Sequence, residues 1–441
     1  QHDILFACPQ QVLTLNADKS LQLSSTSSHS KADELLTTDL LNESKFFNAL
    51  ERLYQRDKDI DPAATSDLPF TGGWFVYLSY EMAEEVEPCL TLPSLPPEHP
   101  LAVAVRCPAA IIHNKQNNQF VAVAEDNFEY LLDKLEQDYL ELLDQPQADS
   151  QTDNNIDIRL RSLQEDEVEP YLQQVDKIKR YIIEGDIFQA NLSRRWKAYL
   201  QSDVDDLDLF RKLAIHNPSS FAAIACLENI TIISSSPERL VSLRDGIVET
   251  RPIAGTRPRD SDRQSDDALA KELLAHPKEQ AEHIMLIDLE RNDLGRVCRP
   301  GTIEVNELMA LESWEHVHHI VSNVRGELEN DKSPIDVLRA VFPGGTITGC
   351  PKVRCMEILA ELEQEPRGAY TGSLGYINTD GSMDFNILIR TMVRETKNNP
   401  DEITFRAGGG IVSDSIAEDE LEETRAKAKG LLKIFSNDQV Y

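Results

Sequence analysis

Apolar residues recur along the chain at strand-like and helical spacings, and one polar stretch divides them into two parts. Before residue 144, strand-like runs precede a segment with helical spacing that begins near Phe128. Residues 144–157, DQPQADSQTDNNID, have almost no apolar content, which is typical of a linker. We therefore predict an N-terminal domain over residues 1–143, a polar linker over residues 144–160 and a larger domain over residues 161–441.

Within these parts the periodicity predicts individual strands and helices. One helix opens at Pro170 and ends at Gly185, because glycine readily terminates a helix. Further helices are predicted near residues 128–143, 277–290, 333–341 and 417–435. Predicted strands cover residues 3–15, 73–80, 101–112, 221–226, 230–235, 373–378, 385–393 and 403–406. Because strands and helices do not alternate regularly, the pattern favours an α+β fold with antiparallel sheets over a doubly wound fold.

Composition narrows the class of protein and its partners. A chain of 441 residues exceeds one compact core, and its 41% apolar content is that of a globular protein. The formal net charge of -32 argues against nucleic acid and anionic membrane surfaces as partners. No apolar run approaches the roughly 18 residues that a membrane span needs.

The cysteines indicate a compartment. Seven are scattered along the chain without a CxxC pair, which fits buried thiols in a reducing environment. The chain starts at Gln1 without a basic and then apolar signal segment. We expect a cytoplasmic protein whose first segment, upstream of Gln1, is missing from the sequence.

Residues 342–352, FPGGTITGCPK, are typical of a binding loop that leads into a helix. Three glycines in this stretch allow the backbone to approach a ligand closely, and Pro351 suits the first turn of a helix. Free amides at such a helix start attract anions. A nucleotide P-loop does not fit, because Cys350 and Pro351 stand where that motif needs Lys and Ser or Thr.

Two pairs of glutamates carry candidate metal chemistry. Glu279 and Glu282 are three residues apart in one predicted helix, and Glu420 and Glu423 are three apart in another. This spacing places both carboxylates of a pair on one helical face. Two such faces meeting would give an oxygen-rich site suited to Mg²⁺. From the spacing alone, a solvated helix surface is the more frequent outcome.

Other candidates also have a plain structural alternative. Arg390 ends an apolar run, where an arginine can bind an anion or simply pair at a strand edge. The run Gly408, Gly409 and Gly410 suits amide contacts to a carboxylate, and equally a turn. His319 follows two other histidines, but no cysteine or carboxylate lies at zinc-ligand spacing.

Several of these motifs together resemble those of the chorismate-utilising enzymes, above all the component I chains of aminodeoxychorismate synthase and anthranilate synthase. The loop at 342–352 carries this resemblance. So do the segments Ala281–Asp293, Glu423–Ala428 and Thr250–Pro258. The resemblance implies an antiparallel β-sandwich flanked by helices, with an intertwined smaller N-terminal α+β domain.

The resemblance also implies a metal site and the groups that hold the substrate. Glu282 and Glu423 would bind Mg²⁺ directly, while Glu279 and Glu420 would support it through water. Lys427 would pair with a carboxylate of chorismate. The remaining substrate-binding positions that match the family pattern are Arg390, Gly408, Gly409, Gly410, Tyr370, Thr346, Gly255 and Thr256.

Two residues match catalytic positions of the family. Glu238, in Ser236-Pro237-Glu238, would be the general acid that protonates the hydroxyl leaving ring carbon 4, which requires a raised pKa. His319 would polarise or deprotonate near the ring.

The nucleophile and the product follow from two further positions. Gln189 stands at the position where the isochorismate- and salicylate-forming relatives carry a lysine that activates water. Glutamine cannot act as that base, so the resemblance implies that the nucleophile is ammonia from a glutamine amidotransferase subunit. Residues 189–193 and 344–349 look more like aminodeoxychorismate synthase, whereas Ala254 points to anthranilate synthase. We expect 4-amino-4-deoxychorismate as the product, for para-aminobenzoate and folate synthesis. Anthranilate is the alternative, and a non-catalytic magnesium- or anion-binding protein is a remote one.

Overall fold

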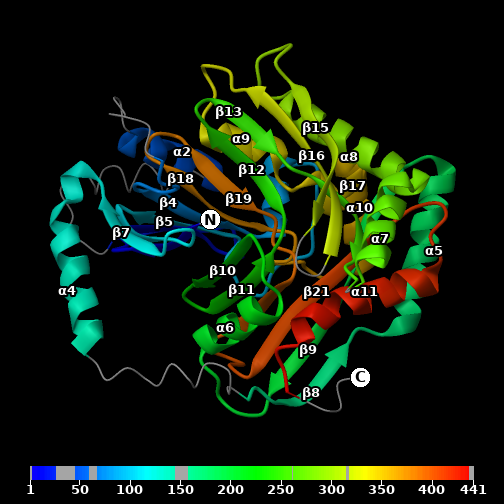
Figure 1. Cartoon of the computed structure of the whole chain (residues 1–441), viewed down its shortest axis with the longest axis horizontal. Coiled ribbons are helices and arrows are strands. Elements are labelled where there is room, and N and C mark those ends of the chain that lie inside the picture. The colour runs from blue at the N-terminus through cyan, green and yellow to red at the C-terminus, as the bar shows by residue number, and fades with distance from the viewer. Residues whose placement is uncertain are drawn as a thin grey trace.

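The computed structural model describes residues 2–25, 45–58, 67–144, 157–260, 262–313 and 317–436. Over these ranges every paired strand runs antiparallel to its neighbours, in three sheets with helices around them (Figure 1). The predicted α+β class with antiparallel sheets is therefore confirmed. Most of the predicted linker, residues 145–156, lies outside the described residues.

The largest sheet joins strands from both ends of the chain. Its order is β14 (Ile253–Pro258), β16 (Val317–Glu327), β13 (Ile247–Thr250), β12 (Arg239–Arg244), β19 (Met383–Asn386), β18 (Ser373–Asn378), β4 (Gly73–Leu78), β5 (Ala102–Cys107), β2 (Gln11–Leu15) and β3 (Leu21–Ser25), with β15 (Glu304–Ser313) beside β16. β18 pairs with β4, so residues about 300 positions apart are direct neighbours, as in the pair Ser373 and Leu78. The N-terminal strands are thus built into the same sheet as the later ones.

The second sheet packs against the first to form a sandwich. Its order is β10 (Phe221–Cys226), β11 (Ile230–Ser236), β20 (Thr391–Glu395), β21 (Glu402–Ile411), β9 (Gln189–Leu200) and β17 (Gly349–Cys350), with β8 (Leu160–Glu165) beside β9. A shared apolar cluster contains Tyr77 and Leu374 from the first sheet and Ile232 from the second. Burial of these side chains holds the two layers together.

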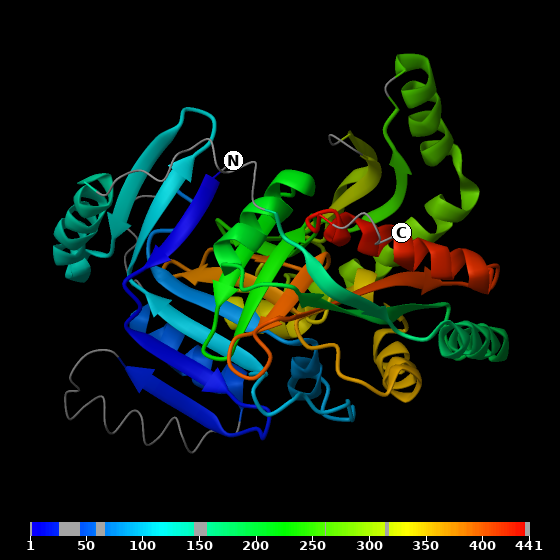
Figure 2. The ribbon, with the colours of Figure 1, turned by 90° about the horizontal axis from the view of Figure 1, so that it is seen from below.

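The third sheet is small and lies at one side of the molecule. It consists of β1 (His2–Ala7), β6 (Ala109–Asn114) and β7 (Gln119–Ala124), against which α4 (Tyr130–Asp144) packs. Figures 1 and 2 both place α4 on the side opposite α11. The sequence analysis predicted one strand over residues 3–15 and one over 101–112, and both predictions are wrong, because each range contains two strands. The first breaks at Cys8, which has a φ of +53°, and the second at Pro108, where the chain passes from one sheet to another.

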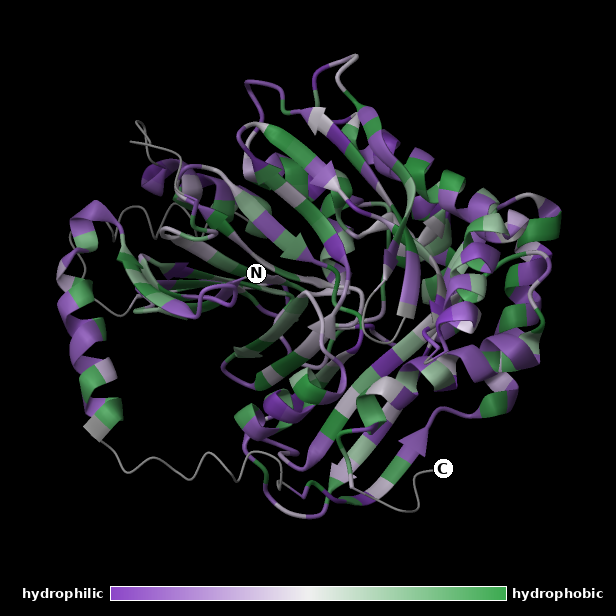
Figure 3. Ribbon diagram, in the orientation of Figure 1, coloured by the Kyte–Doolittle hydropathy of each residue, from purple (hydrophilic) through white to green (hydrophobic). Residues whose placement is uncertain are grey.

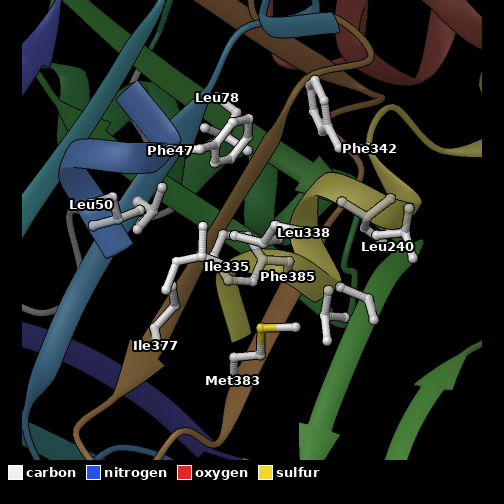
Figure 4. Close-up of a cluster of buried hydrophobic side chains, with 14 of the residues drawn as sticks. Phe47, Leu50, Leu78, Leu240, Ile335, Leu338, Phe342, Ile377, Met383 and Phe385 are labelled. Atoms are coloured by element: carbon white, nitrogen blue, oxygen red, sulfur yellow. The ribbon is translucent and has the colours of Figure 1, made fainter. Parts of the chain in front are cut away.

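Helices cover the outer faces of both large sheets. α2 (Phe46–Asp57) and α9 (Pro334–Val341) pack on the first sheet, and Figure 4 shows Phe47, Leu338 and Phe385 in the apolar core between them. α9 begins with a capping box in which Ser333 and Asp336 bond each other's backbone. In Figure 3 hydrophobic residues concentrate on the strands, whereas the helices alternate hydrophilic and hydrophobic stretches.

The remaining helices border the second sheet and one end of the first. They are α5 (Val168–Glu184), α6 (Asp206–His216), α7 (Arg263–Ala275), α8 (Pro277–Leu294), α10 (Lys352–Glu363) and α11 (Ala417–Leu432). Gly185 ends α5 with a φ of +85°, which confirms the predicted helix end. Over the described ranges, no helix combines the length and apolarity required to span a membrane.

The predicted strand 385–393 is wrong at its centre. β19 ends at Asn386 in the first sheet, and β20 begins at Thr391 in the second. The four residues between them cross from one sheet to the other, and Arg390 adopts a left-handed conformation with a φ of +50°. An apolar run of this length is compatible with one strand, so the sequence pattern does not reveal the crossing.

Candidate active site

The crossing opens into a cavity of about 1960 Å³ between the sheets. This exceeds the roughly 300–1,000 Å³ of a typical small-molecule site, because the cavity continues toward β1 and β10. The sequence-predicted residues on its wall are Gln189, Glu238, Ala254, Gly255, Glu279, Glu282, His319, Thr346, Tyr370, Arg390, Gly408, Gly410, Glu420, Glu423 and Lys427. Gly409 is not among the lining residues, and the side chain of Thr256 falls outside the described part of the structure.

The two glutamate pairs reach this cavity from different helices. α8 carries Glu279 and Glu282, and α11 carries Glu420 and Glu423. A glycine backs the α11 pair, since a Cβ at Gly409 would lie 3.2 Å from Glu420 Oε2 and 3.5 Å from Glu423 Oε1. Carboxylates far apart in the sequence therefore share one cavity.

Each pair also has polar contacts of its own. Arg257 Nη1 lies 3.3 Å from Glu279 Oε1, and the hydroxyl of Ser415 donates to Glu420 Oε1 at 2.5 Å. Lys427 Nζ lies 2.7 Å from Glu423 Oε1 and donates to the carbonyl of Gly408 at 2.8 Å. Lys427 thus connects α11 to β21 and places its cation beside the glutamates.

The donor set fits Mg²⁺ better than a metal that needs a closed protein cage. Within the described ranges no three His, Cys, Asp or Glu side chains converge as a preformed metal cluster. Mg²⁺ does not require one, because it is usually bound by one or two carboxylates and completes its octahedron with water and substrate oxygens. α8 and α11 each place glutamate carboxylates, the ligand type that Mg²⁺ uses, on the wall of this one cavity.

Glu238 is a buried carboxyl beside cationic groups. It follows β11, is 5% exposed, and its Oε1 has no hydrogen-bond partner among the described residues. Burial raises the pKa of Glu238 to about 7. The hydroxyl of Thr346 and the positive charges of Arg390 and Lys427 lower this pKa, but by less than burial raises it. Such a group holds its proton near neutral pH and can act as a general acid.

Arg390 and His319 face the same part of the cavity. Burial lowers the pKa of the Arg390 guanidinium and Glu238 opposes this, but an arginine remains charged at any ordinary pH. Burial, and then the charge of Arg390, lowers the pKa of His319. His319 is therefore neutral, and its Nδ1 lies 3.4 Å from the carbonyl of Gly255. A neutral imidazole can accept a proton or polarise a substrate group.

The neighbouring histidine, His318, does not take part. His318 Nε2 contacts Asp266 Oδ1 at 2.9 Å, and its Nδ1 contacts Ser313 Oγ at 2.8 Å. These contacts join α7 to β16, and His318 does not line the cavity. His316 lies outside the described residues.

The three consecutive glycines are part of a strand and not a turn. β21 pairs Gly408 with Ser193 and Gly410 with Asn191 of β9. A Cβ at Gly410 would lie only 2.1 Å from Gln189 Nε2, so a side chain there would displace Gln189 from the wall. Glycine at 410 thus leaves room for the amide of Gln189 at the cavity.

The loop predicted to bind an anion contributes differently from expectation. Thr346 and Ile347 line the cavity, but the first residues of α10 do not. Pro351 is the N-cap of α10, one position before its first turn, and Lys352 is paired with Asp293 at 2.5 Å. The helix start thus lies away from the cavity wall, and the loop reaches the cavity through its middle.

Comparison with known proteins identifies the family. The model of the chorismate binding enzyme family matches residues 3–433. The chain belongs to this family. An anthranilate synthase component I-like protein of Synechocystis sp. is 38% identical over 401 residues, which are 88% of this chain and 78% of that protein.

Relatives in this family include both kinds of aminating synthase. Aminodeoxychorismate synthase component 1 of Bacillus subtilis is 48% identical over 258 residues, which are 58% of this chain and 54% of that protein. Anthranilate synthase component 1 of the same organism is 39% identical over 385 residues, which are 83% of this chain and 73% of that protein.

Solved structures agree with the family fold. Anthranilate synthase component I of Streptococcus pneumoniae has a TM-score of 0.81 and 30% identity, and the match covers 98% of this chain and 92% of that one. A menaquinone-specific isochorismate synthase of Escherichia coli, at 16% identity and a TM-score of 0.66 over 98% of this chain and 90% of that one, shares the fold.

Sequence reasoning missed several residues of this chorismate-binding fold that line the cavity. Arg406 lies in β21, and its Nε donates to Ser193 Oγ at 3.0 Å. A buried charge in the apolar and glycine-rich strand 402–411 was the available signal. Arg257 and Asn191 lie within motifs that the sequence analysis used, but no chemistry pointed to either side chain individually.

Proposed function

We propose that the chain is the chorismate-converting component of an aminodeoxychorismate synthase. It would form 4-amino-4-deoxychorismate from chorismate and ammonia, for para-aminobenzoate and folate synthesis. The observation that carries this proposal is the buried carboxyl of Glu238 with a pKa of about 7, in a cavity that also holds Arg390, Lys427 and the uncharged Gln189. That combination supports loss of a hydroxyl and entry of a neutral nucleophile.

The cationic groups suit the two carboxylates of chorismate. Arg390 and Lys427 are at the cavity wall, and each can pair with one carboxylate. Glu282 and Glu423 would hold Mg²⁺, with Glu279 and Glu420 acting through water. When bound, the metal ion would neutralise and orient one of the substrate carboxylates.

Glu238 would donate the proton that allows the ring hydroxyl to leave. Ammonia forms a bond to ring carbon 2, both ring double bonds move by one position toward carbon 4, and the C4–O bond breaks, so that the hydroxyl leaves as water with the proton of Glu238. A second ammonia then bonds to carbon 4 as an ammonium group, both double bonds move back, and the C2–N bond breaks, so that the first amine, still protonated, leaves as ammonia. Because residue 254 is alanine, the protein offers no lysine amine there for the first attack.

Gln189 supports ammonia over water as the nucleophile. Its side chain is 8% exposed, lines the cavity, and its Oε1 has no hydrogen-bond partner among the described residues. An amide cannot deprotonate water, but its oxygen can accept a hydrogen bond from ammonia. A glutamine amidotransferase subunit is the proposed source of that ammonia.

One assay tests the proposal. The protein is incubated with chorismate, Mg²⁺ and a high ammonium concentration at alkaline pH, and the products are identified by mass and by fluorescence. We expect aminodeoxychorismate. Fluorescent anthranilate would overturn the assignment of product, and the absence of any turnover would favour a non-catalytic binding protein.

Anthranilate synthesis is the second candidate function. It is favoured by Ala254 and by the fold similarity to the anthranilate synthase of Streptococcus pneumoniae. In that reaction ammonia adds at ring carbon 2 and pyruvate is then eliminated. The motifs at residues 189–193 and 344–349 favour aminodeoxychorismate instead.

A further inference from the structure

A buried arginine outside the cavity connects three separate parts of its wall. Arg367 lies in the turn between α10 and β18, and its side chain is 2% exposed. It is not among the residues that line the cavity. Three residues that it contacts, Asn191, Ile347 and Tyr370, do line it.

The guanidinium of Arg367 makes hydrogen bonds in several directions. Its Nη2 donates to the carbonyl of Asn191 at 2.6 Å, and its Nη1 donates to the carbonyl of Ile347 at 3.2 Å. Its plane lies over the ring of Tyr370, 5.7 Å from the centroid, and over the ring of Tyr80, 4.8 Å from the centroid. One group therefore fixes the start of β9, the loop before β17 and the aromatic ring of Tyr370.

An anion holds the guanidinium in this orientation. Glu363 accepts from Arg367 Nε at 2.9 Å and from Nη2 at 2.8 Å, which is a two-pronged contact. Glu363 also accepts from the amide and hydroxyl of Ser193, at 2.9 and 2.8 Å. The backbone amide of Arg367 donates to Glu81 at 2.7 Å. The arginine cannot turn without breaking several buried hydrogen bonds.

We propose that Arg367 is a positioning residue, which sets the mutual placement of Asn191, the loop at Thr346 and Ile347, and Tyr370. The inference rests on the proposal that this cavity binds chorismate. A displacement of about 1 Å in such a wall can reduce a rate roughly a hundredfold, because the reacting groups lose their alignment. Arg367 would act on the reaction only through the residues it holds.

A lysine at position 367 distinguishes the effect of the planar hydrogen-bonding geometry from the effect of the positive charge. Arg367→Lys keeps a cation beside Glu363, but an ammonium is a point charge that lacks the planar fork for two backbone carbonyls and a carboxylate together. We expect kcat to fall by roughly 10- to 100-fold. The dissociation constant for chorismate, measured by calorimetry, should stay within about threefold of the wild type, since Arg390 and Lys427 are untouched and a threefold change is under 1 kcal/mol.

Arg106→Lys is the matched control. Arg106 is also buried, at 6% exposed, and it pairs with Glu125 and Asp57 and donates to the carbonyl of Gly73. It does not line the cavity. The Arg106→Lys protein should lose thermal stability but keep the wild-type kcat.

A second variant covers the case in which Arg367→Lys does not fold. Tyr80→Leu removes the ring beneath the guanidinium and leaves its hydrogen-bond partners in place. We expect a smaller fall in kcat in the same direction, again without a comparable change in chorismate affinity.

The turnover measured is that of whichever aminated product the wild-type protein forms, so anthranilate formation would overturn the assigned product and leave this test intact. The inference is overturned if folded Arg367→Lys has the wild-type kcat, or if Arg106→Lys loses kcat to the same extent. It is equally overturned if only chorismate affinity falls, or if Tyr80→Leu, used alone, has the wild-type kcat.

Discussion

Glu238 and Glu363 are both buried beside the same cavity, yet their surroundings shift the pKa values of the two carboxyl groups in opposite directions. Glu238 is 5% exposed, and the side chain of Glu363 is 3% exposed. Burial raises the pKa of Glu238 to about 7. Burial would also raise the pKa of Glu363, but the charges of Arg367 and Arg406 and the bonds to Ser193 more than offset it, and the pKa is lowered.

The charged and hydrogen-bonding partners of a buried carboxyl, and not its depth of burial, therefore determine whether it is ionised. Glu363 has two arginines in contact and stays ionised, so it serves to hold the wall in place. Glu238 has cations near it but an oxygen without a hydrogen-bond partner among the described residues, so it can exchange a proton. We call the part of the cavity wall around Glu238 the reactive side, and the part held by Glu363 and Arg367 the rigid side. The two sides thus use the same residue type in different charge states.

The largest expected effect concerns the proposed metal site on the reactive side. Glu423→Gln should reduce ammonia-dependent turnover by roughly a thousandfold or more, because it removes a proposed ligand of the metal ion. By stabilising charge, such an ion lowers the free energy of the transition state by several kcal/mol. Circular dichroism and melting should remain those of the wild type. Glu422→Gln is the control, since Glu422 is 67% exposed and pairs with Arg425. Turnover near the wild-type level in Glu423→Gln would remove the metal assignment.

Glu238→Gln tests the reactive carboxyl itself. We expect kcat to fall by roughly 10²- to 10⁴-fold, since the amide fills the same space but cannot donate the proton. At pH 5 the melting temperature should change little, because the carboxyl is protonated there and the amide is equally uncharged. A steady-state assay with ammonium measures the first quantity and a thermal melt the second. Full activity would show that Glu238 is not the general acid.

Glu363→Gln tests the rigid side, where the main effect should be on stability. Removing this charge leaves Arg367 buried without its carboxylate, which costs about 3–5 kcal/mol in comparable buried pairs. Urea unfolding measures the difference. If Glu363→Gln is as stable as Glu238→Gln, the contrast between the two sites is wrong.

The dependence of stability on pH sharpens the contrast further. A glutamate whose folded pKa is raised from 4.5 to about 7 contributes stability that is complete below pH 4.5 and is lost as pH rises toward 7. Glu238→Gln removes this penalty, so its free energy of unfolding relative to the wild type should be more favourable at pH 8 than at pH 5. A difference that does not change with pH would place the pKa of Glu238 near its ordinary value.

The smallest expected effect is a covalent adduct at the position beside Gly255. Ala254→Lys places an amine on the cavity wall, and under turnover with chorismate we expect a fraction of the protein to carry an adduct visible by intact mass. Untreated Ala254→Lys protein is the reference. Finding no adduct would count against a likeness to synthases that use a lysine there.

Local features of the site were predictable from the sequence, whereas the long-range ones were not. Helical spacing placed Glu279 with Glu282 and Glu420 with Glu423, because side chains three residues apart share a helical face. The resemblance to a family supplied the proposed roles of Glu238 and Arg390. The left-handed conformation of Arg390 was not predictable, because it follows from a chain crossing between two sheets.

The positioning network was hidden for the same physical reason. Arg367 and Glu363 form an ordinary i, i+4 pair in sequence, which is more often found at a surface. Their burial depends on β9, β21 and the segment at Ile347, which contact them from other parts of the chain. Only the folded arrangement shows that the pair supports the cavity.

A difference infrared titration measures the protonation state of Glu238 itself. Glu81 and Glu290 also have pKa values raised by burial, so spectra of the wild type minus Glu238→Gln isolate the carboxyl of interest. We expect a protonated carboxyl band at pH 5 that disappears with a midpoint near pH 7, and no such band for the wild type minus Glu363→Gln. An ionised Glu238 throughout pH 5 to 9 would contradict this expectation.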